Sequence, residues 1–118
     1  MKYGEFITKQ IPKLNIIVMT IKNFMKLNLE EIKKIISEDL PNDKFDSYEF
    51  IRRFAKKFEI EYVNFLSNSI NNHHRTVHSQ IARNLAENQE YLKFQKNGKI
   101  KSETVFGYDV PNEEWVKV

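Results

Sequence analysis

Residues 75–88 predict a helix with hydrogen-bonding side chains along one face. At 100° per residue, Val77, Ile81 and Leu85 form an apolar stripe, with His74 and Asn88 in line with it. The opposite face carries guanidinium, hydroxyl and amide groups, on Arg75, Thr76, Ser79, Gln80 and Arg83. Such groups pair with base edges and phosphates, whereas a purely solvated face more often alternates Glu and Lys. Two interpretations stay open, a face that reads nucleic acid and an ordinary surface.

Basic residues form two clusters without acids. Residues 93–101 contain Lys93, Lys96, Lys99 and Lys101, and the second cluster consists of Arg52, Arg53, Lys56 and Lys57. Lysines on a predicted hairpin can lie along a phosphate backbone, but they also guard an exposed strand edge against pairing with another chain. The lysines alone do not decide between these roles.

Three histidines are the only residues whose spacing resembles a metal site. His74 and His78 are four apart, so on a helix their rings can share one ion, with His73 beside them. The chain has no HExxH motif, and the helical wheel places His74 in the apolar stripe and His78 at its edge. We therefore predict no metal ligands. No serine near these histidines has a nucleophile elbow or an oxyanion glycine, so we do not expect an enzyme.

Composition limits the remaining classes. The chain has 118 residues, enough for one domain, and its nine Phe, five Tyr and one Trp indicate a folded core. Without cysteine there is no disulfide, thiolate nucleophile or Cys-based zinc site. Three glycines and no GxGxxG exclude Gly-rich phosphate loops, so no cofactor is expected. No apolar run approaches the roughly 20 residues of a membrane span and no signal-peptide pattern is present, so we expect a cytoplasmic protein.

Three further helices are predicted before the polar one. The first begins at Pro12 and runs to about Phe24. The second begins at Asn28 as N-cap, with Glu31 completing a capping box, and ends at residues 41–43. The third is one continuous helix of about six turns over residues 47–70, capped by Ser47, with an aromatic stripe facing the core.

The end of the chain predicts a small antiparallel sheet. Residues 91–106 form a hairpin whose turn is Asn97-Gly98, because type I′ turns need positive φ at both central residues. A second turn follows at Gly107–Asn112, and a last strand over residues 114–118 places Trp115 on the core. The predicted class is a single α+β domain, mainly helical with about four helices and a small C-terminal antiparallel sheet.

This order of elements resembles winged helix-turn-helix DNA-binding domains over about residues 47–118. The resemblance implies a recognition helix over residues 75–88 and a basic hairpin wing over residues 91–106, binding double-stranded DNA without catalysis, as a regulator or DNA-binding accessory protein. The resemblance implies that base edges are contacted by Thr76, Ser79, Gln80 and Arg83. It implies that the wing contacts DNA through Lys96, Lys99 and Lys101. Arg75 and Lys93 complete the predicted DNA-binding set.

A second class of function stays open, a protein-interaction module or a small helical oligomer without a nucleic-acid ligand. The apolar residues 16–24 favour it, because an extra apolar helix on a small domain often packs on a partner. The modest formal charge of +3 favours it too. Within residues 1–43 we predict a homodimer contact made by Leu14, Ile17, Val18 and Ile21.

Overall fold

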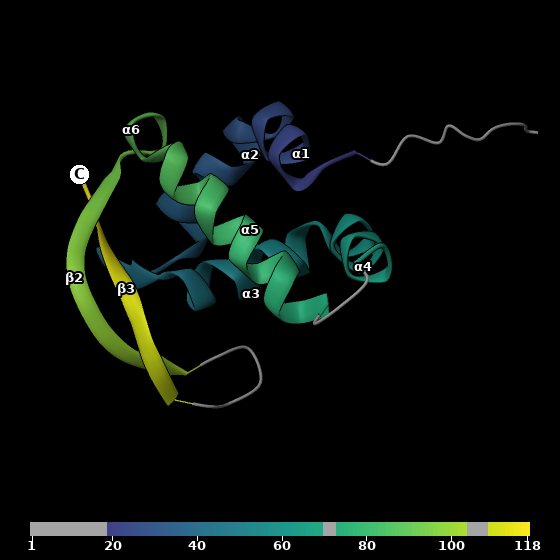
Figure 1. Cartoon of the computed structure of the whole chain (residues 1–118). Coiled ribbons are helices and arrows are strands. Elements are labelled where there is room, and N and C mark those ends of the chain that lie inside the picture. The colour runs from purple at the N-terminus through teal and green to yellow at the C-terminus, as the bar shows by residue number, and fades with distance from the viewer. Residues whose placement is uncertain (1–18, 70–72, 104–108) are drawn as a thin grey trace, which may run out of the picture.

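The computed structural model describes residues 19–69, 73–103 and 109–118. Within these ranges, six α-helices and one π-helix pack beside a three-stranded sheet (Figure 1). In chain order the elements are α1 (Ile21–Leu27), α2 (Leu29–Lys34), the π-helix η2 (Ile35–Asp39), β1 (Lys44–Asp46), α3 (Ser47–Lys57), α4 (Glu59–Ser67), α5 (His73–Glu87), α6 (Gln89–Leu92), β2 (Phe94–Glu103) and β3 (Asp109–Lys117). The predicted class, a mainly helical α+β domain with a small antiparallel sheet, is confirmed.

The sheet has the order β1-β3-β2, with both neighbours antiparallel to β3. Each strand contributes one aromatic ring to the core: Phe45, Phe94 and Trp115, all at most 3% exposed. The three ring centroids lie 5.1–5.7 Å apart. The predicted place of Trp115 on the core is confirmed. Strand β1 was not predicted, because three residues carry no periodicity and this strand exists only through its pairing with β3.

The predicted turn at Asn97-Gly98 is wrong. Strand β2 continues through both residues to Glu103, and the ladder pairs Lys96 with Trp115 but Gly98 with Glu114. Asn97 is therefore the extra residue of a β-bulge, and Gly98 has φ 107°. The positive φ that suggested a turn serves the bulge instead.

Both ends of the predicted hairpin also differ from the structure. Tyr91 and Leu92 belong to the short helix α6 rather than to a strand. Residues 109–112, predicted as part of a turn, are the first residues of β3. The hairpin is consequently longer than predicted, and its connection, residues 104–108, lies outside the described residues.

The prediction of one helix over residues 47–70 is wrong, because the helix breaks at Phe58. Phe58 has φ −114° and ψ 51°, outside the helical region, and separates α3 from α4. The break lets the aromatic stripe follow the core around a bend. Phe24 of α1 meets Phe58 edge-on at 5.0 Å, Phe54 at 6.1 Å and Phe65 at 5.7 Å between ring centroids. Packing of these rings from three helices outweighs the continuity of one helix.

One predicted N-cap is replaced by its neighbour, and the other occupies the predicted position without capping through its side chain. Asp46, not Ser47, caps α3: its Oδ1 accepts hydrogen bonds from the backbone N–H groups of Tyr48 and Glu49 at 2.9 and 3.0 Å. The Glu49 carboxylate accepts in turn from the Asp46 N–H at 3.0 Å, which completes a capping box. Asn28 makes no side-chain cap for α2, because its amide donates back to the carbonyl of Phe24 at 2.8 Å.

Helix α1 begins at Ile21 and belongs to the domain's own core, and residues 12–18 of the helix predicted from Pro12 lie outside the described residues. Thr20 caps α1 by accepting a hydrogen bond from the Asn23 N–H at 3.1 Å. Ile21 is only 5% exposed and lies in the same hydrophobic cluster as the other helices, so the prediction that it forms a dimer contact is wrong. The other predicted dimer residues, Leu14, Ile17 and Val18, lie outside the described residues.

Candidate nucleic-acid interface

Helix α5 crosses the middle of the molecule, with α1, α3 and α4 packed against it (Figure 1). The predicted apolar stripe is confirmed, since Val77, Ile81 and Leu85 are all at most 2% exposed. The prediction for two histidines is wrong: His78, predicted at the edge of the stripe, is buried, and His74, predicted within the stripe, is exposed. The reason is α4, which packs against α5 on the side that carries His78 and covers it.

The predicted polar face of α5 lies at the surface. Arg75, Ser79, Gln80 and Arg83 are exposed, and Thr76 is half-buried. These residues recur at three- and four-residue spacing, so they follow one side of a helix that is about four turns long. The structure therefore gathers on one face the five residues of α5 that belong to the predicted DNA-binding set.

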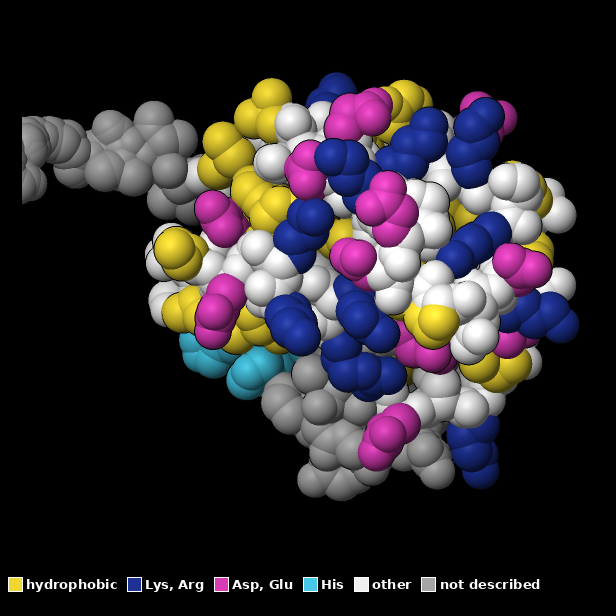
Figure 2. Space-filling view, turned by 180° about the vertical axis from the view of Figure 1, so that it is seen from behind, with side chains coloured by type: hydrophobic (Ala, Val, Ile, Leu, Met, Phe, Trp, Pro, Cys, Tyr) yellow, Lys and Arg dark blue, Asp and Glu magenta, His cyan; other side chains and the backbone are white. Residues whose placement is uncertain are grey.

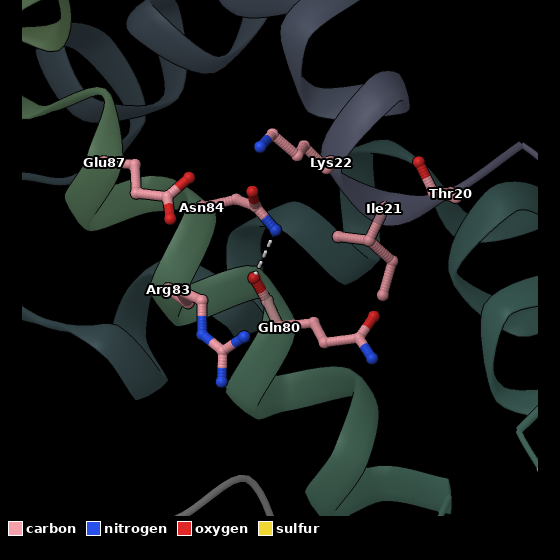
Figure 3. A pocket seen from close by; sticks show the side chains of 7 residues that line it. All are labelled: Thr20, Ile21, Lys22, Gln80, Arg83, Asn84 and Glu87. Atoms are coloured by element: carbon pink, nitrogen blue, oxygen red, sulfur yellow. Dashed lines mark hydrogen bonds between the residues drawn. The ribbon is translucent and has the colours of Figure 1, made fainter.

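A shallow groove of about 220 Å³ separates this face from α1 (Figure 3). In the close-up, the Gln80 amide extends toward Thr20 and Ile21, whereas the Arg83 guanidinium extends away from α1. The remaining lining residues are Lys22, Asn84 and Glu87. A ligand that fills this groove therefore lies between Gln80 and the first turn of α1.

Sequence reasoning missed Thr20 and Lys22 as members of this surface. A signal existed for Thr20, because a threonine directly before an apolar-periodic run is a typical N-cap and marks where a helix begins. No local pattern indicates Lys22, since its position beside Arg83 and Glu87 depends on how α1 packs across α5.

Asn84 fixes the floor of the groove. It is 7% exposed, and its amide donates to the Gln80 carbonyl at 2.8 Å (Figure 3). Asn88 repeats this bond one turn later, donating to the Asn84 carbonyl at 2.7 Å. Both amides are thus turned back onto the helix, so the exposed α5 side chains at the groove are those of Gln80, Arg83 and Glu87.

The buried histidine joins α4 to α5. The Tyr62 hydroxyl and His78 Nε2 are 2.6 Å apart, and the two rings stack at 5.8 Å with an interplanar angle of 15°. Burial, and secondarily the charge of His74, lowers the pKa of His78 to about 4, so its ring is neutral at pH 7. Burial raises the pKa of the Tyr62 hydroxyl. A neutral imidazole that is hydrogen-bonded to a tyrosine is a structural contact that holds these two helices together.

The other two histidines do not converge on His78 as a ligand set. His73 Nδ1 lies 2.9 Å from the carbonyl of Leu66, at the end of α4. The His74 ring meets His78 edge-on at 5.9 Å between centroids. Among residues 19–69, 73–103 and 109–118, no three His, Asp or Glu side chains are grouped so as to hold a metal ion.

The predicted wing is a long hairpin whose four lysines, Lys93, Lys96, Lys99 and Lys101, are all exposed. Alternation along β2 puts Lys99 and Lys101 on one face and the half-buried Ile100 and Ser102 on the other. Lys93 is separate from the rest. It ends α6 and lies eight residues from Lys101, a distance of roughly 26 Å along an extended strand.

Two hydrogen bonds tie the outer part of the hairpin to α3, and a third lies within the hairpin. The Ser47 hydroxyl donates to Asn112 Oδ1 at 3.0 Å, and the Asn112 amide donates to the Ser102 hydroxyl at 3.4 Å. Arg52 of α3 donates to the Glu103 carbonyl at 3.2 Å. The face of Lys99 and Lys101 is thereby turned away from α3.

The hairpin is less basic than the sequence of β2 implies. Strands β2 and β3 together carry four lysines and four acids, so they have no net charge. The lysines are Lys96, Lys99, Lys101 and Lys117, and the acids are Glu103, Asp109, Glu113 and Glu114. Glu113 lies directly across the ladder from Lys99, and Glu114 accepts a hydrogen bond from the Asn97 amide at 2.9 Å. Pairing with β3 therefore offsets the acid-free run that the sequence showed.

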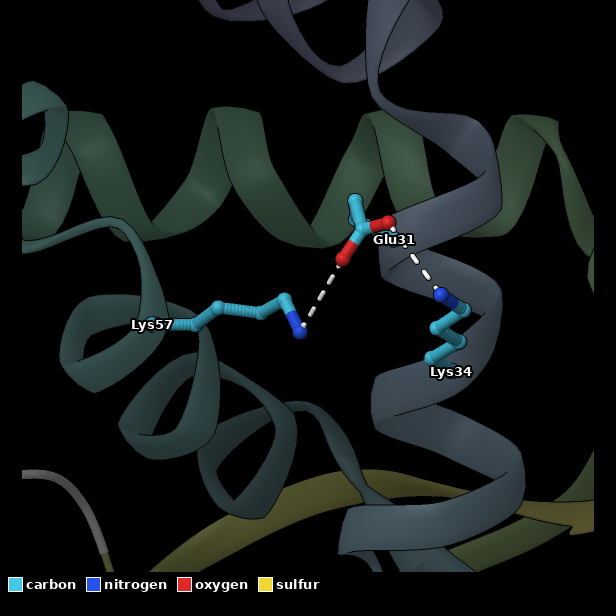
Figure 4. A network of polar contacts seen from close by, with 3 residues as sticks. All are labelled: Glu31, Lys34 and Lys57. Carbon is cyan, nitrogen blue, oxygen red and sulfur yellow. Dashed lines mark hydrogen bonds and ion pairs between the residues drawn. The ribbon is translucent and has the colours of Figure 1, made fainter.

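The second basic cluster, on α3, is also interspersed with acids. Lys57 contacts Glu31 of α2 at 3.3 Å, and Lys34 contacts the same carboxylate at 3.5 Å (Figure 4). The two lysines lower the pKa of Glu31, chiefly through the hydrogen bond from Lys57. The face opposite to that of Figure 1 shows Lys and Arg side chains running down its middle with Asp and Glu between them (Figure 2).

Comparison with family models, with curated proteins and with solved structures finds no match to this chain. In the part of the chain that the structure describes, no helix is long and apolar enough to cross a membrane.

Proposed function

We propose that this chain binds double-stranded DNA without catalysing a reaction, as winged helix-turn-helix domains do. Helix α5 enters the major groove with its polar face, and the β2–β3 hairpin lies along the flanking backbone. The observation that carries the proposal is the placement of α5. Three helices hold it in place, and it still exposes Arg75, Ser79, Gln80 and Arg83 along one side.

The break at Phe58 supports a helix-turn-helix unit made of α4 and α5. It leaves α4 with nine residues, and five residues separate Ser67 at its end from His73 at the start of α5. In helix-turn-helix proteins the second helix reads base edges with its N-terminal residues. The first two turns of α5 expose His73, His74, Arg75 and Ser79, which are hydrogen-bonding groups suited to that role.

The charges favour contact through α5 more than through the hairpin. Arg75 and Arg83 lie on the exposed face of α5, and Lys22 adds a cation across the groove. Among the described residues that line the groove, Glu87 is the one acid. The hairpin as a whole is neutral, so Lys99 and Lys101 position it on the backbone without adding a strong long-range attraction. We expect a small number of phosphate contacts and a correspondingly shallow salt dependence.

The experiment is fluorescence anisotropy of a labelled random-sequence duplex pool, titrated with the full chain at 50 mM and 200 mM salt. We expect binding that weakens with salt, with a slope of about −0.9 for each phosphate contacted. The double variant Arg75→Ala/Arg83→Ala should bind at least about tenfold more weakly. Arg53→Ala, the same exchange at an exposed position on α3, is the matched control and should bind like the wild type.

Two outcomes would contradict the proposal. No detectable wild-type binding at 50 mM salt would falsify DNA binding itself. A larger loss from Arg53→Ala than from the α5 double variant would place the contact on α3 and reject the role of α5.

A second candidate function is protein binding through α4, and one observation favours it. Ile60 and Val63 lie one turn apart on α4 and are 74% and 50% exposed, which is unusual for two large apolar side chains on one face. If this face pairs with a second copy, sedimentation velocity should show a dimer that Ile60→Ser/Val63→Ser converts to monomer. DNA affinity unchanged by that variant would show that the two surfaces are independent.

A further inference from the structure

A pocket of about 490 Å³ lies between η2 and the end of β3, beside the junction of α6 and β2. Its volume falls in the range of sites that bind small molecules, about 300–1,000 Å³. None of the residues proposed for base contacts on α5 lines it. Of the predicted wing lysines only Lys93 does, at the end of the hairpin remote from Lys101.

The floor of the pocket is apolar. Ile36, Leu40 and Leu92 line it, and they are 2%, 4% and 1% exposed. They come from η2, from the residue that follows it and from α6, so the floor is the outer surface of the hydrophobic core. A hydrocarbon group in this pocket would contact these side chains and would itself be removed from water.

The rim of the pocket is cationic. Lys33, Lys93 and Lys117 line it, and in the part of the chain that the structure describes Asp43 is the one acidic lining residue. Lys117 Nζ donates to the Leu40 carbonyl at 2.7 Å, and Lys33 Nζ lies 4.9 Å from the centre of the Tyr91 ring. An ammonium group has three donors, so Lys117 keeps two for a ligand.

Lys93 is the most available of the three cations. Among the described residues its ammonium has no hydrogen-bond or ion-pair partner, and its side chain is exposed. Its backbone is left-handed, with φ 68° and ψ 54°, and its carbonyl accepts from the Val118 N–H at 2.9 Å. The main chain at Lys93 is thus fixed while the charge remains free to contact a ligand.

Backbone hydrogen bonds fix the segments around the pocket. The Lys117 N–H donates to the Asp43 carbonyl at 2.8 Å, and the Leu40 N–H closes the π-helix on the Ile35 carbonyl at 2.9 Å. π-Helical turns are rare and occur frequently at functional sites. Here the turn carries Ile36, part of the floor, and ends at Leu40, whose carbonyl holds Lys117.

We propose that this pocket binds a small amphiphilic anion, a carboxylate joined to a hydrocarbon chain as in a medium-chain fatty acid. The hydrocarbon covers Ile36, Leu40 and Leu92, and the carboxylate lies among Lys33, Lys93 and Lys117. A compact anion such as inorganic phosphate would contact the cations but would not reach across the apolar side chains that also line the pocket. The inference does not depend on DNA binding, because it uses a different surface.

The test is titration of the full chain with octanoate, monitored by isothermal calorimetry and by the chemical shifts of the backbone amides. We expect saturable binding, with the largest shifts in residues 36–41, 92–93 and 117. Octanol has the same chain without the charge and should bind at least about tenfold more weakly. The double variant Lys33→Gln/Lys93→Gln should bind octanoate about tenfold or more weakly than the wild type. The matched control Lys96→Gln/Lys99→Gln should bind octanoate with wild-type affinity.

Several results would overturn the proposal. These are no saturable octanoate binding, equal affinity for octanol, wild-type affinity in the Lys33/Lys93 variant, or amide shifts centred elsewhere, for example on α4. Binding to phosphatidylglycerol vesicles is measured in a separate experiment. Binding to vesicles without binding to free octanoate would indicate a membrane surface as the ligand and reject a small-molecule site.

Discussion

Tyr62 and His78 form a stacked, hydrogen-bonded pair, with the tyrosine hydroxyl 2.6 Å from Nε2 of a histidine that is 8% exposed. The pair joins the two helices of the proposed helix-turn-helix unit, because Tyr62 belongs to α4 and His78 to α5. Burial disfavours the charged form of the imidazole, and this makes the joint sensitive to acid.

The first prediction concerns the pH dependence of stability. The pKa of His78 is about 4 in the folded chain and 6.5 as its ordinary value. As pH falls below about 6.5 the unfolded chain takes up the proton first, so stability is complete above that pH and is lost as pH falls toward 4. Between pH 7 and pH 5 we expect a loss on the order of 1 kcal/mol, or roughly 5 °C in Tm.

The measurement is thermal unfolding of the wild type and His78→Gln at pH 7, 6 and 5. Tyr62 does not ionise in this range, and His74 is present in both proteins, so the comparison isolates His78. The variant lacks the titrating ring, so its Tm should vary less over this range, even though its Tm at pH 7 is lower. Parallel curves for the two proteins would show that His78 does not carry the effect.

The second prediction concerns the aromatic core. Phe54 is fully buried and packs against the rings of Phe24, Phe50 and Phe58 at 5.1–6.1 Å between centroids. Phe54→Ala leaves a cavity among these rings and should cost about 3–5 kcal/mol of unfolding free energy. Ile60→Ala, at a position 74% exposed, should change it by less than about 0.5 kcal/mol. Urea denaturation followed by circular dichroism compares the two, and equal midpoints would contradict the assigned packing.

The third prediction concerns the bulge in β2. Gly98 has φ 107°, and a Cβ built there meets no atom within 4 Å. Gly98→Ala therefore adds no clash, and its expected cost of about 1 kcal/mol or more comes from the backbone conformation alone. Asn97→Ala removes only an exposed hydrogen bond to Glu114 and should cost less than about 0.5 kcal/mol.

Nuclear Overhauser effects distinguish the bulge from a turn at the same residues. Ile100 and Asn112 are cross-strand partners, as are Lys101 and Pro111, and both pairs should give cross-peaks. A hairpin that reversed at Asn97-Gly98 would instead bring Lys96 close to Lys99, and that cross-peak should be absent.

The fourth prediction separates the proposed roles of α5 and the hairpin in DNA binding. Arg83→Ala should reduce the binding free energy by about 1–3 kcal/mol, unequally across sequences, because the variant cannot make a bidentate pair with a base edge. Lys99→Gln/Lys101→Gln should weaken all duplexes alike and reduce the salt slope by about one for each phosphate that is no longer neutralised. Anisotropy on a panel of defined duplexes at two salt concentrations measures both. The assignment fails if Arg83→Ala acts uniformly and the lysine variant acts selectively.

Local periodicity in the chain was sufficient to predict several features of the fold. The spacing of Val77, Ile81 and Leu85 identified the buried side of α5, and with it the exposed side that carries Arg83, because a helix buries one stripe when it packs on a core. The aromatic stripe predicted over residues 47–70, which includes Phe54, was placed in the core for the same reason. Trp115 was predicted on the core from its place in the last strand, and the fold class followed from the order of elements.

Features that depend on contacts between distant residues could not be predicted in this way. Phe58 breaks a helix because Phe24, more than thirty residues earlier, offers a ring to pack against. Gly98 lies in a bulge rather than a turn because β3 pairs along the whole of β2, and the same pairing sets acids against the lysines of β2. His78 is buried because α4 folds back over α5. The pocket lined by Lys33, Lys93 and Lys117 combines three segments, and no local pattern encodes their meeting.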